Sequence, residues 1–212
     1  MTSTDAPTAA TARRGRKPAL ESEIERRLLL DAGLAVLKRS SYERATLDDV
    51  LAEAGLGTRA FYRHFDSKDE LLCAIHRRDA DAAVQRVARA VAAASDPVAA
   101  LHAWVDEVLG IAFKPRRASR ARSLWVGETA TVAGYAAERE RSMRAFAAPL
   151  TDVLRAGRAA GVFPDADPDA DAETINAITW STLAGFPTGA PRLDEHAARA
   201  HVVRFALRAI GA

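Results

Sequence analysis

The stretch TLDDVLAEAGLGTRAFYRHF, residues 46–65, decides the fold of the first part of the chain. Thr46 followed three residues later by Asp49 is typical of a capped helix start, and Gly55 is typical of a helix end. A second short helix is expected to begin directly after Gly57. Two helices joined by a short, glycine-containing turn form a helix-turn-helix, whose second helix fits the major groove of DNA.

The second of these helices has a polar outer face, which suits contact with DNA. Arg59 can bind O6 and N7 of guanine through its guanidinium, and Thr58 can contact a thymine methyl or a base edge. Phosphate contacts are expected from neighbouring side chains of suitable reach: Tyr62, Arg63, His64 and Lys68. The alternative for the two arginines is a solvated surface, and for Tyr62 a core position with an exposed hydroxyl.

Residues 1–20 are expected to form a flexible basic arm, because they are rich in Ala, Thr, Arg and Pro and show no helical periodicity. Four cations of this arm could enter the adjacent minor groove: Arg13, Arg14, Arg16 and Lys17. The alternative is disorder without DNA contact.

Composition is that of an ordinary globular protein. The chain has 212 residues, 49% of them hydrophobic, and a net charge of only +2, so DNA binding must depend on where the charges lie. The single cysteine, Cys73, excludes an internal disulfide and is expected to be a small buried side chain. With no signal peptide and no apolar run long enough to span a membrane, we expect a cytoplasmic protein without a membrane partner.

Helical signals continue to the end of the chain, so we expect an all-α fold. Asp96-Pro97 and Asp167-Pro168 each place a capping acid before a proline of the first turn, and Pro149 is expected to kink a long helix. The predicted organisation is the arm of residues 1–20, a helix-turn-helix domain of residues 21–68 and a larger helical bundle of residues 69–212. The predicted helices cover about 24–37, 46–55, 68–94, 97–113, 117–128, 135–160, 168–184 and 194–210, besides the short recognition helix.

The segment LLLDAGLAVLKRSSYERATLDDVLAEAGLGTRAFYRHFDSKDELL, residues 28–72, resembles the DNA-binding domain of the tetracycline-repressor (TetR) family of bacterial transcriptional regulators. The resemblance implies a homodimer whose larger domain binds a small effector. It also implies base reading by Thr58 and Arg59, and phosphate contacts by Thr46, Tyr62, His64 and Lys68.

Three residues depart from the family pattern. Gly57 stands where a capping serine is usual, and Ser41 replaces the usual glycine after the first helix. Asp48 occupies a position where relatives often contact DNA, but a carboxylate there would repel phosphate. We therefore exclude Asp48 from the expected DNA contacts and assign it to the positive end of its own helix.

Large apolar side chains with a few polar neighbours in the second domain could line an effector pocket, as the family resemblance implies. The candidates are Leu101, Trp104, Val105, Val108, Trp125, Met143, Phe146 and Thr179. The alternative for each is ordinary bundle core.

A palindromic operator needs two reading helices held at a fixed distance, which predicts a homodimer. The last two helices carry apolar stripes that could pair with their symmetry mates in a four-helix interface. The candidates are Ile178, Trp180, Val203, Ala206, Leu207 and Ile210. The alternative is that both stripes face the core of their own subunit.

Together these features predict a transcriptional regulator, expected to be a repressor that a small apolar effector releases from a palindromic DNA operator. The alternative is an architectural DNA-binding protein without an effector. An enzyme is not expected, because the sequence has no phosphate-binding loop, nucleophile elbow or metal-ligand motif. No cofactor and no metal are predicted.

Overall fold

The computed structural model describes residues 10–124, 132–189 and 191–212, with side chains from residue 20 onward. These residues are helical with connecting turns and contain no strand, as expected for an all-α fold. The helices are α1 (Ala10–Arg39), α2 (Leu47–Ala54), α3 (Thr58–Tyr62), α4 (Lys68–Ala92), α5 (Pro97–Phe113), α6 (Pro115–Leu124), α7 (Tyr135–Ala159), α8 (Pro168–Thr182) and α9 (Glu195–Ala209). The chain divides into two compact units, Met1–Leu71 and Leu72–Ala212.

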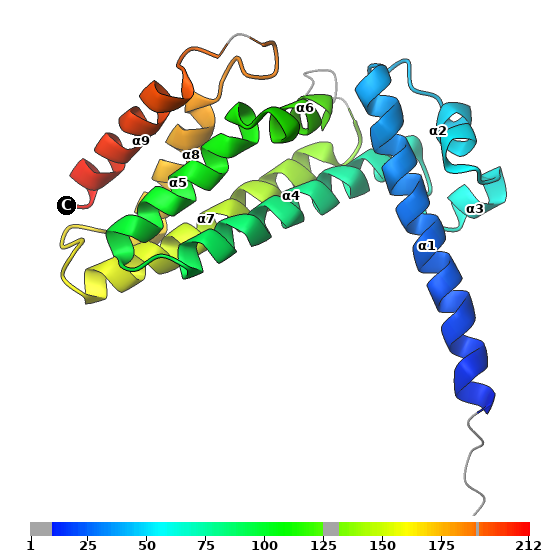
Figure 1. Cartoon of the computed structure of the whole chain (residues 1–212), viewed down its shortest axis with the longest axis horizontal. Helices are drawn as coiled ribbons and strands as arrows, with labels where there is room; N and C mark the ends of the chain where they lie inside the picture. Colours follow the sequence, from blue (N-terminus) through cyan, green and yellow to red (C-terminus); the bar gives the residue numbers. More distant parts are fainter. Residues whose placement is uncertain (1–9, 125–131, 190) are drawn as a thin grey trace, which may run out of the picture. The chain divides into compact units, whose positions relative to one another are not determined.

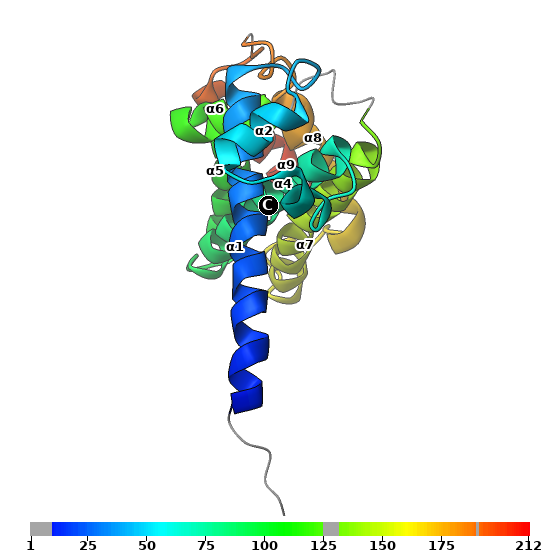
Figure 2. The same cartoon turned by 90° about the vertical axis from the view of Figure 1, so that its right-hand side faces the viewer.

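The N-terminal unit is a helix-turn-helix supported by a long first helix. α2 and α3 pack against the C-terminal part of α1, whose first turns project beyond them (Figures 1 and 2). The buried side chains of this unit are few, and the fully enclosed Phe61 lies among them. The main members of this small core are Leu29, Leu30, Leu34, Val50, Phe61 and Phe65.

The start of α1 differs from the prediction of an aperiodic arm. The helix begins at Ala10, so residues 10–20 of the expected arm are helical, and residues 1–9 lie outside the described part. Ala, Arg and Lys are good helix formers, and adding turns to an existing helix avoids the cost of nucleation. The packed C-terminal half of α1 therefore allows helix to extend into a segment without an apolar stripe.

The predicted helix ends of this unit are confirmed. Thr46 and Asp49 form a reciprocal capping box, and Gly55 ends α2 in the left-handed region at φ 65°. Gly57 caps α3 with its backbone alone. At the start of α4, the Ser67 hydroxyl accepts a hydrogen bond from the N–H of Glu70 at 3.1 Å.

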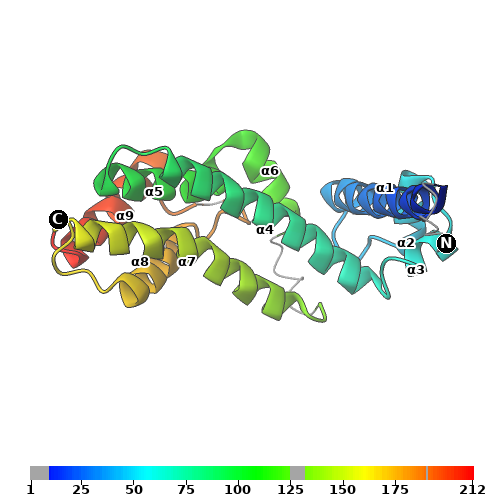
Figure 3. The ribbon, with the colours of Figure 1, turned by 90° about the horizontal axis from the view of Figure 1, so that it is seen from below.

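The second unit is a helical bundle in which α7 packs on α8 and α5, and α9 packs on α5 and α8 (Figure 3). Asp96 and Asp167 cap α5 and α8 ahead of a first-turn proline, as predicted. Pro149 lies inside α7. No helix of the described residues has the length and apolar character needed to cross a lipid bilayer.

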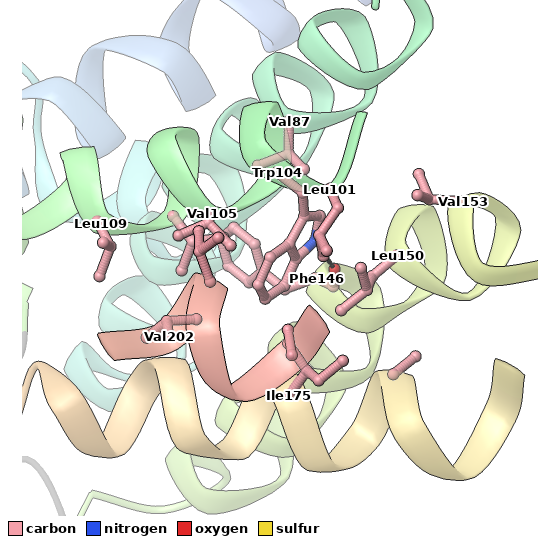
Figure 4. Close-up of a cluster of buried hydrophobic side chains, with 14 of the residues drawn as sticks. Val87, Leu101, Trp104, Val105, Leu109, Phe146, Leu150, Val153, Ile175 and Val202 are labelled. Atoms are coloured by element: carbon pink, nitrogen blue, oxygen red, sulfur yellow. Dashed lines mark hydrogen bonds between the residues drawn. The ribbon is translucent and has the colours of Figure 1, made fainter. Parts of the chain in front are cut away.

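The core of this bundle is continuous and apolar (Figure 4). Trp104 on α5 is fully buried, and its indole N–H donates to the carbonyl of Phe146 on α7 at 2.9 Å. This bond satisfies the one polar group of a large buried side chain, so Trp104 joins α5 to α7 without an unpaired donor.

Candidate nucleic-acid interface

The outward face of α3 carries the two residues predicted to read bases. Thr58 and Arg59 are exposed, whereas the next two residues of the helix, Ala60 and Phe61, are buried in the small core. Within the described part of the chain, the side chains of Thr58 and Arg59 have no hydrogen-bond or ion-pair partner. Tyr62, at the end of α3, is 56% exposed and packs edge-on against Phe61. These three side chains are therefore available to a molecule outside the unit.

His64 is placed differently from the prediction. Its Nε2 lies 3.0 Å from Oε2 of Glu25 on α1, and its side chain is only 6% exposed. Arg63 shares the same carboxylate at 3.1 Å but remains half exposed. In this conformation His64 is occupied by Glu25 and joins the end of α3 to α1, so its contact with phosphate stays a prediction.

Lys68 is also occupied within the unit. Its Nζ donates to the carbonyl of Tyr42 at 3.0 Å and to that of Ala45 at 2.9 Å, and lies 4.1 Å from the centre of the Tyr42 ring. The Tyr42 hydroxyl donates in turn to Asp69. Lys68 thus fastens the start of α4 to the turn between α1 and α2, and its contact with phosphate stays a prediction.

Thr46 remains exposed while it caps α2. Its hydroxyl accepts from the N–H of Asp49 at 3.1 Å and donates to the Asp49 carboxylate at 2.6 Å. The hydrogen bonds that the hydroxyl and the backbone N–H of Thr46 donate to this carboxylate hold the pKa of Asp49 below its ordinary value. The Thr46 hydroxyl is therefore committed to the cap, and any phosphate contact has to share it.

Arg44, which the sequence analysis did not single out, is an exposed cation in the turn between α1 and α2. It has no ion-pair partner among the residues described. Its neighbours Tyr42 and Ala45 bind Lys68, so the turn that carries Arg44 is held in place. No sequence pattern around Arg44 distinguishes it from other surface cations. Only the fold shows that it lies in the turn just before α2.

The predicted arm cations lie in the first turns of α1. Arg13, Arg14, Arg16 and Lys17 belong to the helical backbone, but their side chains are outside the described part. Minor-groove contact by these residues stays a prediction.

The predicted effector-pocket residues gather in the bundle of the second unit. Leu101, Trp104, Val105, Val108 and Phe146 all belong to its apolar core, and Met143 is half-buried. Thr179 is fully buried, and its hydroxyl donates to the carbonyl of Ile175 at 2.7 Å. Trp125 lies outside the described residues. The members that are described pack together, so their role toward a ligand stays a prediction.

The predicted dimer stripe of α9 faces inward. Ala206 and Ile210 are fully buried and Val203 is 8% exposed, all within the core of their own subunit. These three assignments to an interface are wrong, because α9 has to cover α5 and α8 with this stripe. Ile178, Trp180 and Leu207 remain partly exposed. The outer face of α9 instead exposes Phe205, by 40%.

A buried polar cluster between α4 and α7 escaped the sequence analysis. Glu138 is 5% exposed and accepts from Arg77 at 2.7 Å and from Arg141 at 2.6 Å. Burial alone would raise its pKa, but the hydrogen bonds and charges of the two arginines outweigh burial, so the pKa is lowered. Burial lowers the pKa of the neighbouring His76, whose Nε2 lies 3.3 Å from the Ser142 hydroxyl. In the described residues, no three His, Cys, Asp or Glu side chains form a metal site.

Comparison with known proteins agrees with this geometry. Residues 29–75 match the family model of bacterial regulatory proteins of the tetR family. Over 60 residues the chain is 40% identical to the HTH-type transcriptional regulator SrpR of Pseudomonas putida. That match spans 28% of this chain and 28% of the length of SrpR.

Solved structures share the fold of nearly the whole chain. A tetR-family regulator from Mesorhizobium loti has a TM-score of 0.72 at 14% identity, covering 88% of this chain and 96% of that one. SmeT, the repressor of the Stenotrophomonas maltophilia efflux pump SmeDEF, has a TM-score of 0.66 at 24% identity, covering 87% and 89%. FadR of Bacillus subtilis, in complex with stearoyl-CoA, has a TM-score of 0.68 at 14% identity, covering 86% and 98%. The helix-turn-helix region of this chain thus matches the tetR family of bacterial transcriptional regulators, and the rest of the chain shares the fold of the solved structures named above.

Proposed function

We propose that this protein is a cytoplasmic, homodimeric repressor that binds a palindromic operator through α3 and leaves it when a small, largely apolar effector binds the second unit. The observation that carries the DNA-binding part is the outward face of α3. Arg59 there is an exposed cation with no partner among the described side chains, on a helix whose other face is anchored by the buried Phe61. Such a helix can enter a major groove without losing its packing.

The side chains proposed to contact DNA are those that are exposed in the N-terminal unit. Thr58 and Arg59 read base edges, and Tyr62, Arg63 and the newly recognised Arg44 contact phosphates. Thr46 supports the start of α2 and shares its hydroxyl with a phosphate. His64 and Lys68 hold the unit together and act on DNA binding through its geometry.

The effector part is supported by the composition of the second unit and by its structural relatives. The α5–α7–α8 core is rich in large apolar side chains, and the FadR relative was solved with stearoyl-CoA, a ligand with a long apolar chain. Binding between these helices would be coupled to the DNA affinity by about 1–3 kcal/mol, a usual size for linked sites.

The dimer part uses the surface that α8 and α9 leave exposed, not the stripe first predicted. Phe205 on α9 is a large exposed apolar side chain, and small exposed residues of α8, which packs on α9, would allow close helix approach. Exposed small residues of α8 include Ala177 and Ser181, and the exposed Ala184 follows the end of the helix. Phe205→Glu should yield folded monomers by sedimentation, whereas Ala206→Glu should unfold the bundle.

The test of DNA reading begins with selection of bound fragments from the source genome, which supplies the operator. Arg59→Ala should then weaken operator binding by about 1–3 kcal/mol and relax specificity at one base pair. Arg158→Ala is the matched control, because it removes an exposed cation from α7 in the other unit. Equal loss in both variants, or an unchanged base preference for Arg59→Ala, would contradict base reading by α3.

The test of the effector uses the same operator. Apolar small molecules should raise the melting temperature of the protein and lower its operator affinity together. Operator binding that no stabilising ligand weakens would favour the architectural alternative.

A further inference from the structure

Glu25 on α1 contacts the two residues that directly follow α3. Its Oε2 lies 3.0 Å from Nε2 of His64 and 3.1 Å from Nη1 of Arg63. The same Nη1 lies 3.4 Å from the other oxygen, Oε1. The two partners differ in exposure, because the side chain of His64 is almost fully buried whereas that of Arg63 is half exposed. One carboxylate thus joins a fixed ring to a long cation at the surface.

The carboxylate of Glu25 is itself held in place. Leu29 and Leu30 follow Glu25 by about one helical turn, and both are buried in the small core of the N-terminal unit, so this part of α1 is packed. The side chain of Glu25 is only 23% exposed. The packed helix on one side and the buried His64 ring on the other therefore set the position from which Glu25 meets Arg63.

The contact with Glu25 leaves a complete edge of the Arg63 guanidinium open. A guanidinium binds two oxygens of one phosphate through a pair of N–H groups that lie on the same edge. Glu25 uses Nη1, whereas Nε and Nη2, which share an edge, have no hydrogen-bond partner among the residues described. Arg63 is therefore held at one nitrogen while the edge that suits phosphate stays available.

We propose that Glu25 is a positioning residue for DNA binding, which holds Nη1 of Arg63 so that the Nε–Nη2 edge is already oriented to bind an operator phosphate. Holding a long side chain before DNA arrives removes part of the entropy that ordering it on DNA would cost. In the complex Glu25 keeps Nη1, and the chain of contacts runs from His64 through Glu25 and Arg63 to the phosphate. This role rests on the proposed contact of Arg63 with phosphate, and it is independent of the effector and of the dimer surface.

Glu25→Asp tests the contact in the full chain without a change of net charge. The side chain is shorter by one methylene and cannot reach His64 and Arg63 together, so affinity for the selected operator should fall about three- to tenfold. In an Arg63→Gln background the same substitution should change the affinity by less than about twofold, because the side chain that it positions is gone. Glu53→Asp is the matched control, since Glu53 pairs with Arg39 at 2.8 Å in the same unit and neither residue is a proposed DNA contact.

The direction of the change decides between positioning and competition. Tighter operator binding by Glu25→Asp would show that Glu25 competes with phosphate for Arg63, and it would overturn the positioning role. An equal loss of affinity with and without Arg63 would overturn it too, because the effect would then come from the His64 contact and the fold of the unit. The same holds for an equal loss in Glu53→Asp.

Arg63→Gln by itself separates this role from the proposed function. If Arg63→Gln weakens operator binding and Glu25→Asp does not, the phosphate contact of Arg63 stands and the positioning role of Glu25 is wrong. If Arg63→Gln leaves operator binding unchanged, the phosphate contact is wrong and the role of Glu25 is wrong with it.

Discussion

The two units of this chain treat polar side chains in opposite ways. Among the described residues, the polar ones that are buried as whole residues, Glu138, Ser142, Asn176 and Thr179, all belong to the second unit, whereas the N-terminal unit buries the side chain of His64 against Glu25. The N-terminal unit keeps Thr58, Arg59 and Tyr62 outside and uses Lys68 and His64 to fasten its turns. A unit with a small core has little apolar surface to offset the burial of charge, whereas a larger bundle can hold a paired carboxylate inside.

This difference in the placement of polar side chains indicates where a binding surface is to be expected in each unit. In the N-terminal unit the exposed polar groups are the working surface, and their placement follows from local helix signals. In the second unit the polar groups join helices that are far apart in the chain. Glu138 on α7, for example, binds Arg77 on α4, 61 residues earlier. A ligand that separates α4 from α7 would have to compete with these bonds.

The largest expected effect comes from removing the main core side chain of each unit. Phe61→Ala and Trp104→Ala should each destabilise their own unit by about 3–5 kcal/mol, since both side chains are fully buried. All three tryptophans, Trp104, Trp125 and Trp180, lie in the second unit. Tryptophan fluorescence therefore reports the unfolding of that unit alone, while far-ultraviolet circular dichroism reports both.

Phe61→Ala should separate the two signals in a denaturant titration, with an early loss of ellipticity before any change in fluorescence, and should abolish DNA binding. Trp104→Ala should move the fluorescence transition, which Trp180 still reports. If Phe61→Ala shifts both signals together, the two units unfold as one and the comparison between them fails.

The next effect concerns the buried carboxylate of the second unit. Glu138→Gln should lower the free energy of unfolding by about 1–3 kcal/mol, because the hydrogen bonds of two arginines lose their charged acceptor. Glu140→Gln is the control on the same helix, since Glu140 is paired with Arg144 but 69% exposed, and should change stability by less than about 0.5 kcal/mol. Equal effects at the two positions, measured by fluorescence in urea, would show that burial of the Glu138 cluster has no energetic weight.

Replacing Lys68 tests whether its charge stabilises the N-terminal unit or contacts DNA. Lys68→Met should lower the stability of the N-terminal unit by about 1–2 kcal/mol, because the carbonyls of Tyr42 and Ala45 lose their donor. The salt dependence of operator binding should keep its slope. The control Lys38→Met removes an exposed lysine from α1 and should leave stability unchanged. A slope that falls by about one unit would return Lys68 to the phosphate contacts.

The smallest expected effect is the pH dependence contributed by His76. Burial favours the neutral ring, so the pKa of His76 in the folded protein lies below its ordinary 6.5. The unfolded chain binds a proton more readily, so this contribution to stability is present above pH 6.5 and is lost as the pH falls toward the folded pKa. His76→Gln should flatten the fluorescence-detected stability between about pH 7 and pH 5, the region where histidine titrates. The exposed His196→Gln on α9 is the control, and an equally flat profile for it would remove His76 as the cause.

The sequence by itself determined most of the helices and several of their ends. Thr46, Gly55, Asp96 and Asp167 act on backbone groups within four residues, so their signals can be read locally. The outward placement of Thr58 and Arg59 was predicted for the same reason, since Phe61 on the same short helix had to face the core. The start of α1 at Ala10 could not be read in this way, because its extension depends on a helix already held by packing.

Only the tertiary structure decided which polar and apolar side chains are free to bind something else. His64 and Lys68 have the right chemistry for phosphate, but Glu25, Tyr42 and Ala45 take them up from 23 to 39 residues away. The stripe of α9 could equally have formed an interface, until its burial against α5 and α8 assigned it to the core. Periodicity reveals that a helix has an apolar face, but the partner of that face is set by contacts between segments distant in sequence, which no local pattern encodes.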